Sequence, residues 1–252
     1  NFKNSNKKLV LIHTTFLIII LTALVIPILY MINNIFVDFD NIDFFDVFEL
    51  SKNTIFISFI ASILIILVVL FIQYVKRISN SKVLNFVGEI ISLTYALPGA
   101  VIGISIILLF APVNDSFSFL LIGSIPVLVY AYFIRYMAVA VSPILTSFKK
   151  YPKKLDDAGK SIGLKPFQFF RKIFIPLNKN AIIIAFCICF VDIMKDLPLT
   201  LILRPFNFDT LATQTYEYAI EEMITKSSIY SLTIIIFGII LLSILSIKQS
   251  KK

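Results

Sequence analysis

The sequence predicts an all-α, polytopic membrane protein with about six transmembrane helices and one charged cytoplasmic loop. Hydrophobic residues make up 58% of the 252 residues, and the mean hydropathy of +0.93 is typical of chains that reside in lipid. Apolar runs of the ~20 residues that a helix needs to cross the hydrocarbon core recur along the chain. Because these runs do not alternate in polarity as barrel strands do, a helical bundle is predicted.

Apolar runs define the predicted spans of one membrane domain over residues 1–252. They cover residues 9–32, 53–75, 90–111, 117–141, 181–203 and 229–247. The polar stretches between them predict a cytoplasmic loop at 142–180 and a periplasmic segment at 204–227. The chain begins with Asn1 and shows no soluble domain, and we expect it to be the second half of a longer chain.

Lysines and arginines predict the orientation, because short loops rich in them stay in the cytoplasm. They precede the first span, follow the second, separate the fourth from the fifth and end the chain, whereas the other loops are mostly acidic. We therefore expect a multi-pass membrane protein with both termini cytoplasmic. The net charge of +8 reflects this topology and contact with membrane lipids. No nucleic-acid partner is expected, since no basic patch outside the spans is interleaved with aromatics.

The cytoplasmic loop opens with a short amphipathic helix. Leu155, Ala158 and Ile162 recur at i, i+3 and i+7 and form one apolar stripe on an otherwise charged segment. Gly163 is the kind of residue that ends a helix in a left-handed turn.

A second short helix is predicted to begin at Pro166, a favoured first helical residue. Phe167, Phe170 and Phe174 follow at helical spacing, and Pro176 breaks this helix before the fifth span. Two apolar stripes on the cytoplasmic side call for a partner groove. The alternative is a pair of interfacial helices lying flat on the lipid headgroups.

The same loop resembles the coupling loop of permeases in bacterial ABC importers. The family pattern is Glu-Ala-Ala, three residues, Gly, nine residues and Ile-x-Leu-Pro, and here it reads Asp157-Ala158-Gly159, Gly163, then Ile173 to Pro176. The resemblance implies the type I importer permease fold, a place in the bacterial inner (plasma) membrane and a cytoplasmic ABC ATPase dimer as partner. The ATPase-coupling residues that it implies are Asp156, Asp157, Ala158, Gly159, Gly163 and Pro176. Gly159, in place of the second Ala, should loosen the helix by ~1 kcal/mol.

Gly159-Lys160-Ser161 looks like the end of a phosphate-binding loop. The full motif requires Gly where Lys154 stands and a preceding strand, and the sequence offers neither. We therefore expect a permease subunit without its own ATPase site, no enzyme activity and no cofactor.

A second stretch, residues 190–213, resembles the permeases of iron(III) importers, as does Thr94-Tyr95-Ala96-Leu97-Pro98-Gly99. The resemblance implies iron(III) transport, a periplasmic iron(III)-binding protein and a second permease half or subunit. Permeases for thiamine, sulfate, molybdate or polyamines share the coupling loop and stay open as alternatives. Half of a secondary transporter is the alternative from a different class, and it would need no ATPase.

Three ionisable residues in the predicted fifth span are candidates for the translocation path, because charges inside a membrane are costly. Asp192 and Asp196 are spaced to share one helix face, with Lys195 beside them. They are either a neutralised structural cluster or an acidic surface suited to Fe³⁺, a hard cation. Tyr95 is a further path candidate, and Arg135 is expected to pair with a carboxylate or carbonyl inside the bundle. No metal ligand set is assigned.

Two further features concern the close approach of helices and the start of a short helix. Gly99 and Gly103 permit close approach of another helix. A short helix is predicted in the periplasmic segment, with Asp209 or Thr210 as its N-cap.

Overall fold

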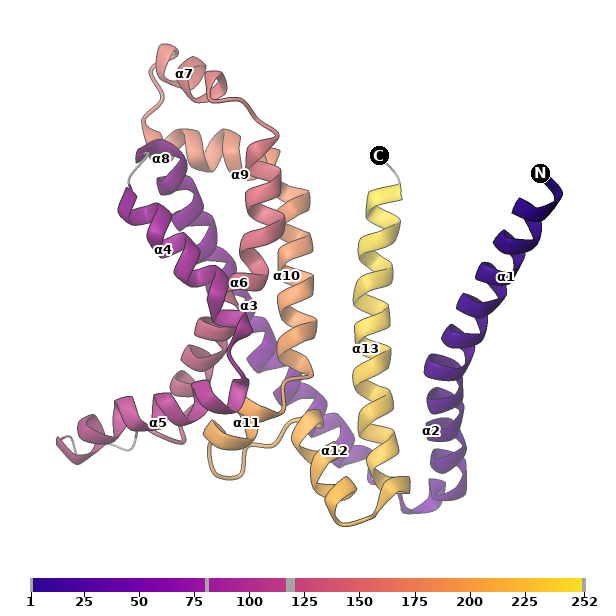
Figure 1. The fold of residues 1–252 in the computed structure, drawn as a ribbon. Coiled ribbons are helices and arrows are strands. Elements are labelled where there is room, and N and C mark those ends of the chain that lie inside the picture. The colour runs from indigo at the N-terminus through magenta and orange to yellow at the C-terminus, as the bar shows by residue number, and fades with distance from the viewer. Residues whose placement is uncertain (1, 80–81, 117–120, 251–252) are drawn as a thin grey trace.

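The computed structural model describes residues 2–79, 82–116 and 121–250, and these residues form helices with no strand among them (Figure 1). Four helical stretches are long and apolar enough to span a membrane: Leu9–Val37, Phe44–Ser79, Ile125–Lys149 and Ile224–Ser246. Two bent helix pairs bring the number of candidate spans to six. The predicted all-α class and the expected number of spans are confirmed.

The first span lies at the edge of the bundle. Helices α1 (Phe2–Ile20) and α2 (Ile26–Val37) are joined by a π-helical turn, Leu21–Val25. α2 packs against α13 (Ile224–Ser250), and the Asn34 side-chain amide donates to Ser228 Oγ at 3.0 Å. α1 diverges from α13 toward the chain start (Figure 1).

Three helices form the core: α3 (Phe44–Ser79), α6 (Ile125–Lys149) and α10 (Lys179–Met194). Their contacts bury large apolar side chains completely or nearly so, and this packing stabilises the bundle. These side chains are Ile57, Ile65, Val69, Leu128, Tyr132, Ile144 and Ile193.

The third predicted span, residues 90–111, is not a single helix. α4 (Lys82–Leu93) and a 3₁₀ turn (Thr94–Ala96) meet α5 (Gly99–Ser116) at a bend of 115°. Leu97 is extended there because the residue before a proline is disfavoured from helix, and Pro98 lacks a donor N–H. Beyond the bend, the far end of α5 projects from the bundle (Figure 1).

α5 packs closely on α11 (Pro198–Leu203). A Cβ atom on Gly103 would lie only 3.2 Å from the Ile202 side chain, and one on Gly99 would meet Arg135 and Pro198. The predicted role of these glycines in close helix approach is confirmed.

The remaining spans differ from their predicted bounds. α6 begins at Ile125, and the predicted start at 117 lies outside the described residues. The predicted fifth span, 181–203, holds two helices, because α10 ends at Met194 and α11 follows after a break. α13 begins at Ile224, before the predicted 229, and the short helix α12 (Leu211–Ile220) precedes it.

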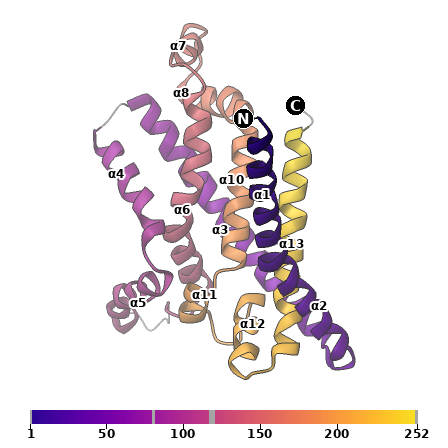
Figure 2. The ribbon, with the colours of Figure 1, turned by 45° about the vertical axis from the view of Figure 1, so that its right-hand side comes forward.

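The two ends of the bundle carry different elements. The start of α1, the end of α13 and α7 (Lys154–Ser161) lie at one end, whereas α11 and α12 lie at the other (Figures 1 and 2). This arrangement agrees with termini and charged loop on the same side of a membrane.

Candidate functional site

The charged loop folds as two helical segments joined by a glycine turn. α7 ends at Ser161, and Gly163, just past its C-cap residue Ile162, has a φ of +77° in the left-handed region that favours glycine. The Gly163 amide donates to the Lys160 carbonyl at 2.9 Å and the Leu164 amide to the Gly159 carbonyl at 3.1 Å, which is a Schellman motif. The next helix begins at Pro166, so both predicted boundaries are confirmed.

The second segment is irregular. α8 (Pro166–Phe169) passes into a π-helical turn (Phe170–Phe174) and then α9 (Ile175–Leu177), which meets α10 at a bend of 75°. This π-helical turn, like the one after α1, directly precedes an Ile-Pro pair. A proline donates no hydrogen bond, and a wider turn accommodates that loss.

Gly159 allows α7 to rest on the second segment. It is buried, and a Cβ atom there would lie 2.6 Å from Cε2 of the Phe169 ring. Alanine at this position would therefore require Phe169 to move. The sequence indicated only a loss of helix propensity, whereas the structure adds a packing reason for glycine.

Arg77, near the end of α3, fastens the loop to the bundle. Its guanidinium donates to Asp156 Oδ2 from Nε at 2.9 Å and lies 2.8 Å from it through Nη2. It also donates to the Phe148 carbonyl at 2.8 Å and to the Pro152 carbonyl at 3.0 Å. Only 10% of the Arg77 side chain and 17% of the Asp156 side chain are exposed. One cation therefore joins α3, the end of α6 and α7.

Aromatic contacts support the same junction. The Arg77 guanidinium lies 5.1 Å from the centroid of the Phe174 ring, which is a cation–π contact. The Tyr74 hydroxyl donates to the Pro166 carbonyl at 2.8 Å. Phe170 and Phe174 are buried within the protein, so the expectation that they await a partner groove is wrong for these two, whereas Phe167 of the same predicted stripe is 68% exposed.

The outward face of α7 is open. Asp157 and Ala158 are exposed, and Ile162 is 71% exposed. Leu155 packs against the core instead, so the predicted stripe is divided between the protein interior and the surface. Asp156 faces Arg77 and is not part of the open face, and Pro176 is exposed beside the bend into α10.

Asp196 is the buried charge of the intramembrane site. It lies after the end of α10, is 4% exposed, and accepts from the Tyr136 hydroxyl at 2.5 Å and from the Leu199 amide at 2.9 Å. Arg135 Nε lies 3.7 Å from its carboxylate, which confirms the expected pairing of Arg135. The Thr200 hydroxyl donates to the Asp196 carbonyl at 2.7 Å. These contacts join α6 to the start of α11.

Asp192 and Asp196 do not share a helix face, because α10 ends between them. Asp192 pairs with Lys195 at 2.8 Å, and 59% of the Lys195 side chain is exposed. The expected single Asp–Lys cluster is therefore two separate pairs. Tyr95 lies at the bend of the third span, 50% exposed, with its ring 6.3 Å from that of Tyr136.

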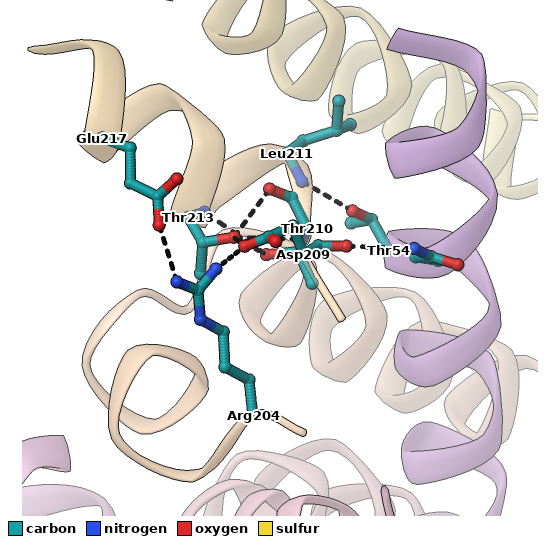
Figure 3. Close-up of polar contacts among 8 residues, drawn as sticks. Thr54, Arg204, Asp209, Thr210, Leu211, Thr213 and Glu217 are labelled. Carbon is teal, nitrogen blue, oxygen red and sulfur yellow. Dashed lines mark hydrogen bonds and ion pairs between the residues drawn. The ribbon is translucent and has the colours of Figure 1, made fainter. Parts of the chain in front are cut away.

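A polar network at the other end of the bundle centres on Arg204. Its guanidinium pairs with Glu217 at 2.6 Å and also with Asp209 (Figure 3). This fork holds the connection between α11 and α12 against α12 itself.

The same network reaches α3. Thr54 Oγ1 accepts from the Leu211 amide at 2.9 Å (Figure 3). Thr210 caps α12 by accepting from the Thr213 amide at 3.3 Å, so the second of the two expected N-cap residues holds this position. α3 is thus bonded near both ends, to α12 at one and to α7 at the other.

Sequence reasoning missed the roles of Arg77, Tyr74 and Tyr136. Arg77 follows an apolar run, and in the sequence it indicates only the orientation of the second span. Its partner Asp156 is 79 positions away in the chain, and no local pattern links the two.

Comparisons with known proteins agree with this geometry. The model of the family described as "Binding-protein-dependent transport system inner membrane component" matches residues 77–249. Over 147 residues the chain is 26% identical to the Fe(3+)-transport system permease protein FbpB 2 of Haemophilus influenzae. That match covers 58% of this chain and only 28% of the length of the relative.

Solved structures of ABC transporters share the fold. A bacterial alginate importer in complex with a periplasmic protein bound to alginate pentasaccharide has a TM-score of 0.74 at 14% identity, covering 96% of this chain and 93% of its own. The inward-facing MetNI methionine transporter has a TM-score of 0.61 at 17% identity, covering 79% and 93%. The chain belongs to the family of inner-membrane components of binding-protein-dependent transport systems.

Proposed function

We propose that this chain is the permease subunit, or half of the permease, of an ATP-driven importer of iron(III). The observation that carries the proposal is the open face of α7, where Asp157, Ala158 and Ile162 project from a loop that Arg77 fastens to the bundle. An exposed apolar side chain on a fixed helix suits docking into a groove. Iron(III) as substrate is supported by the Fe(3+)-transport relative.

In the proposed mechanism, α7 docks in a cleft of a cytoplasmic ABC ATPase dimer. Closure of the dimer on ATP moves the loop, Arg77 transmits this movement to α3, and the spans reopen toward the periplasm. Hydrolysis belongs to the separate ATPase. A periplasmic iron(III)-binding protein delivers the substrate, and a second permease half or subunit completes the path. Both termini then face the cytoplasm of a bacterial cell.

The candidate path residues have different roles in this proposal. Asp196 is a structural clamp, because its carboxylate is occupied by Tyr136 and Arg135. Asp192 offers a carboxylate that suits a hard cation. The neighbouring Lys195 weakens that attraction, as a path that must release its substrate requires.

Uptake of radioactive iron(III) by cells that express the full transporter tests the proposal, with labelled sulfate measured in parallel. Asp157→Lys reverses the charge of one side chain on the docking face and should abolish iron uptake. Asp40→Lys, the same charge change at an exposed residue at the other end of the bundle, should leave uptake intact.

Different outcomes would reject different parts of the proposal. Uptake of sulfate, thiamine or a polyamine in place of iron would retain the permease and reject its substrate. Normal iron uptake by Asp157→Lys would reject the docking face. Transport without any co-purifying ATPase would indicate half of a secondary transporter.

A further inference from the structure

A cationic cavity lies at the end of the bundle that carries α7. It has two lobes of about 500 and 330 Å³, which share Gln73, Lys76 and Leu145 and are therefore adjacent. The larger lobe is bounded by α3, α4 and α6, and the smaller one by α3, α6 and the start of the loop. Both fall within the size range of small-molecule sites.

Three lysines line this cavity: Lys76, Lys149 and Lys153. Within the described part of the chain, none of them forms an ion pair, and Glu89 is the single acidic residue among the lining side chains. Arg77 also lines the smaller lobe, but its charge is matched by Asp156. The cavity therefore has an excess of positive charge.

Gln73 supplies a second, independent feature. Its side chain is 3% exposed, and Oε1 finds no hydrogen-bond donor among the described residues. A buried acceptor without a donor costs free energy, so a ligand that brings a donor is favoured. Lys76 approaches the backbone of α4 closely, since a Cβ atom on Gly88 would lie 2.8 Å from Lys76 Nζ. Glycine at that position leaves room for the ammonium group.

The position of the cavity at the ends of two spans indicates that its ligand comes from the lipid headgroups. Lys76 lies close to the end of α3, and Lys149 is the last residue of α6. Lysines at span ends lie at the depth of lipid phosphates, and basic pockets between spans bind acidic headgroups. Leu93, Val141 and Leu145 give the larger lobe an apolar wall along which an acyl chain can lie.

We propose that this cavity binds an anionic phospholipid whose headgroup carries free hydroxyl groups, as phosphatidylglycerol does. The phosphodiester contacts Lys76 and Lys149, and a headgroup hydroxyl donates to Gln73 Oε1. Because Lys153 immediately precedes α7, the bound lipid also holds the coupling loop in place.

The test uses the purified full-length protein in detergent, mixed with equal amounts of phosphatidylglycerol and zwitterionic phosphatidylethanolamine. Native mass spectrometry counts the lipids that each chain retains. Phosphatidylglycerol should be preferred, and Lys76→Gln and Lys149→Gln should each reduce the preference by roughly fivefold. Lys172→Gln removes an exposed lysine of the same loop that does not line the cavity, and it should leave the preference unchanged.

Gln73→Leu separates the two contacts. It should weaken retention of phosphatidylglycerol but not of phosphatidic acid, which has no headgroup hydroxyl beyond its phosphate. Equal retention of the two original lipids, or an unchanged preference in the Lys76→Gln, Lys149→Gln double variant, would overturn the proposal. Displacement of the lipid by soluble glycerol phosphate at equal concentration would instead assign the cavity to a free anion.

Discussion

The pair of Arg77 and Asp156 permits a quantitative prediction about the coupling loop. Asp156→Asn removes one charge while keeping nearly the same shape, and Arg77→Gln removes the other charge together with the guanidinium group. The pair is short, at 2.8 Å, and its side chains are only 10% and 17% exposed. Asp156 Oδ2 receives two guanidinium nitrogens, so the neutral amide cannot reproduce the charge-assisted pair.

The expected coupling free energy is about 2 kcal/mol, from the range for hydrogen bonds to charged groups that are partly shielded from water. Asp156→Asn should lower the free energy of unfolding by more than this coupling free energy, because it leaves a largely buried guanidinium without its counter-charge. Arg77 would still keep its two backbone carbonyl acceptors, Phe148 and Pro152, which limits the loss.

The measurement is a double-mutant cycle of unfolding free energies. Unfolding is monitored by far-UV circular dichroism in mixed micelles. Asp157 and Lys160 provide a matched control pair in the same loop. They lie 3.4 Å apart with 71% and 69% of their side chains exposed, and their coupling should be within about 0.5 kcal/mol of zero. Equal couplings for the two pairs would refute the anchoring role of Arg77.

The remaining predictions concern two glycines and the buried acid. Gly159→Val should destabilise the loop by about 1–3 kcal/mol through overlap with Phe169, with partial rescue by Phe169→Leu, as judged by protease sensitivity of the loop. Gly163→Val should cost only about 1–2 kcal/mol of strain, because nothing lies within 4 Å of a Cβ there. It should nevertheless abolish transport with membrane insertion intact, and active transport by this variant would contradict a docking surface around the turn. Asp196→Ala should cost about 3–5 kcal/mol by leaving Arg135 unpaired, and an unchanged melting temperature would exclude the clamp.

The fold class and most of the loop could be predicted from the sequence because they depend on local signals. Apolar run length predicts spans, and Gly163 and Pro166 each act within one helical turn. Bends were harder to place. Pro98 stands inside an apolar run, and composition alone cannot tell a bent span from a straight one. α10 ends at Met194 rather than next to Pro198, which separated two acids that had been assigned to one face.

The polar contacts could not be predicted, because they join residues far apart in the chain. Arg135 had an expected class of partner, and the structure identifies it as Asp196 from another helix. Asp156 was expected to be an ATPase-coupling residue, and only its contact with Arg77 of α3 shows that it faces the bundle. The need for glycine at position 159 could not be predicted either, because it arises from the Phe169 ring on the next helical segment.

The unbroken length of α3 has a mechanical consequence. Thr54 is hydrogen-bonded to Leu211, the first residue of α12, and Arg77 is hydrogen-bonded to Asp156 of α7. Their separation along the helix axis is about 35 Å at the standard rise per residue. A helix without a proline or glycine between these points tilts as a rigid rod, so a 5° tilt about one end displaces the other by roughly 3 Å. In the proposed mechanism, α3 therefore joins the docking loop to the opposite end of the bundle through one continuous helix.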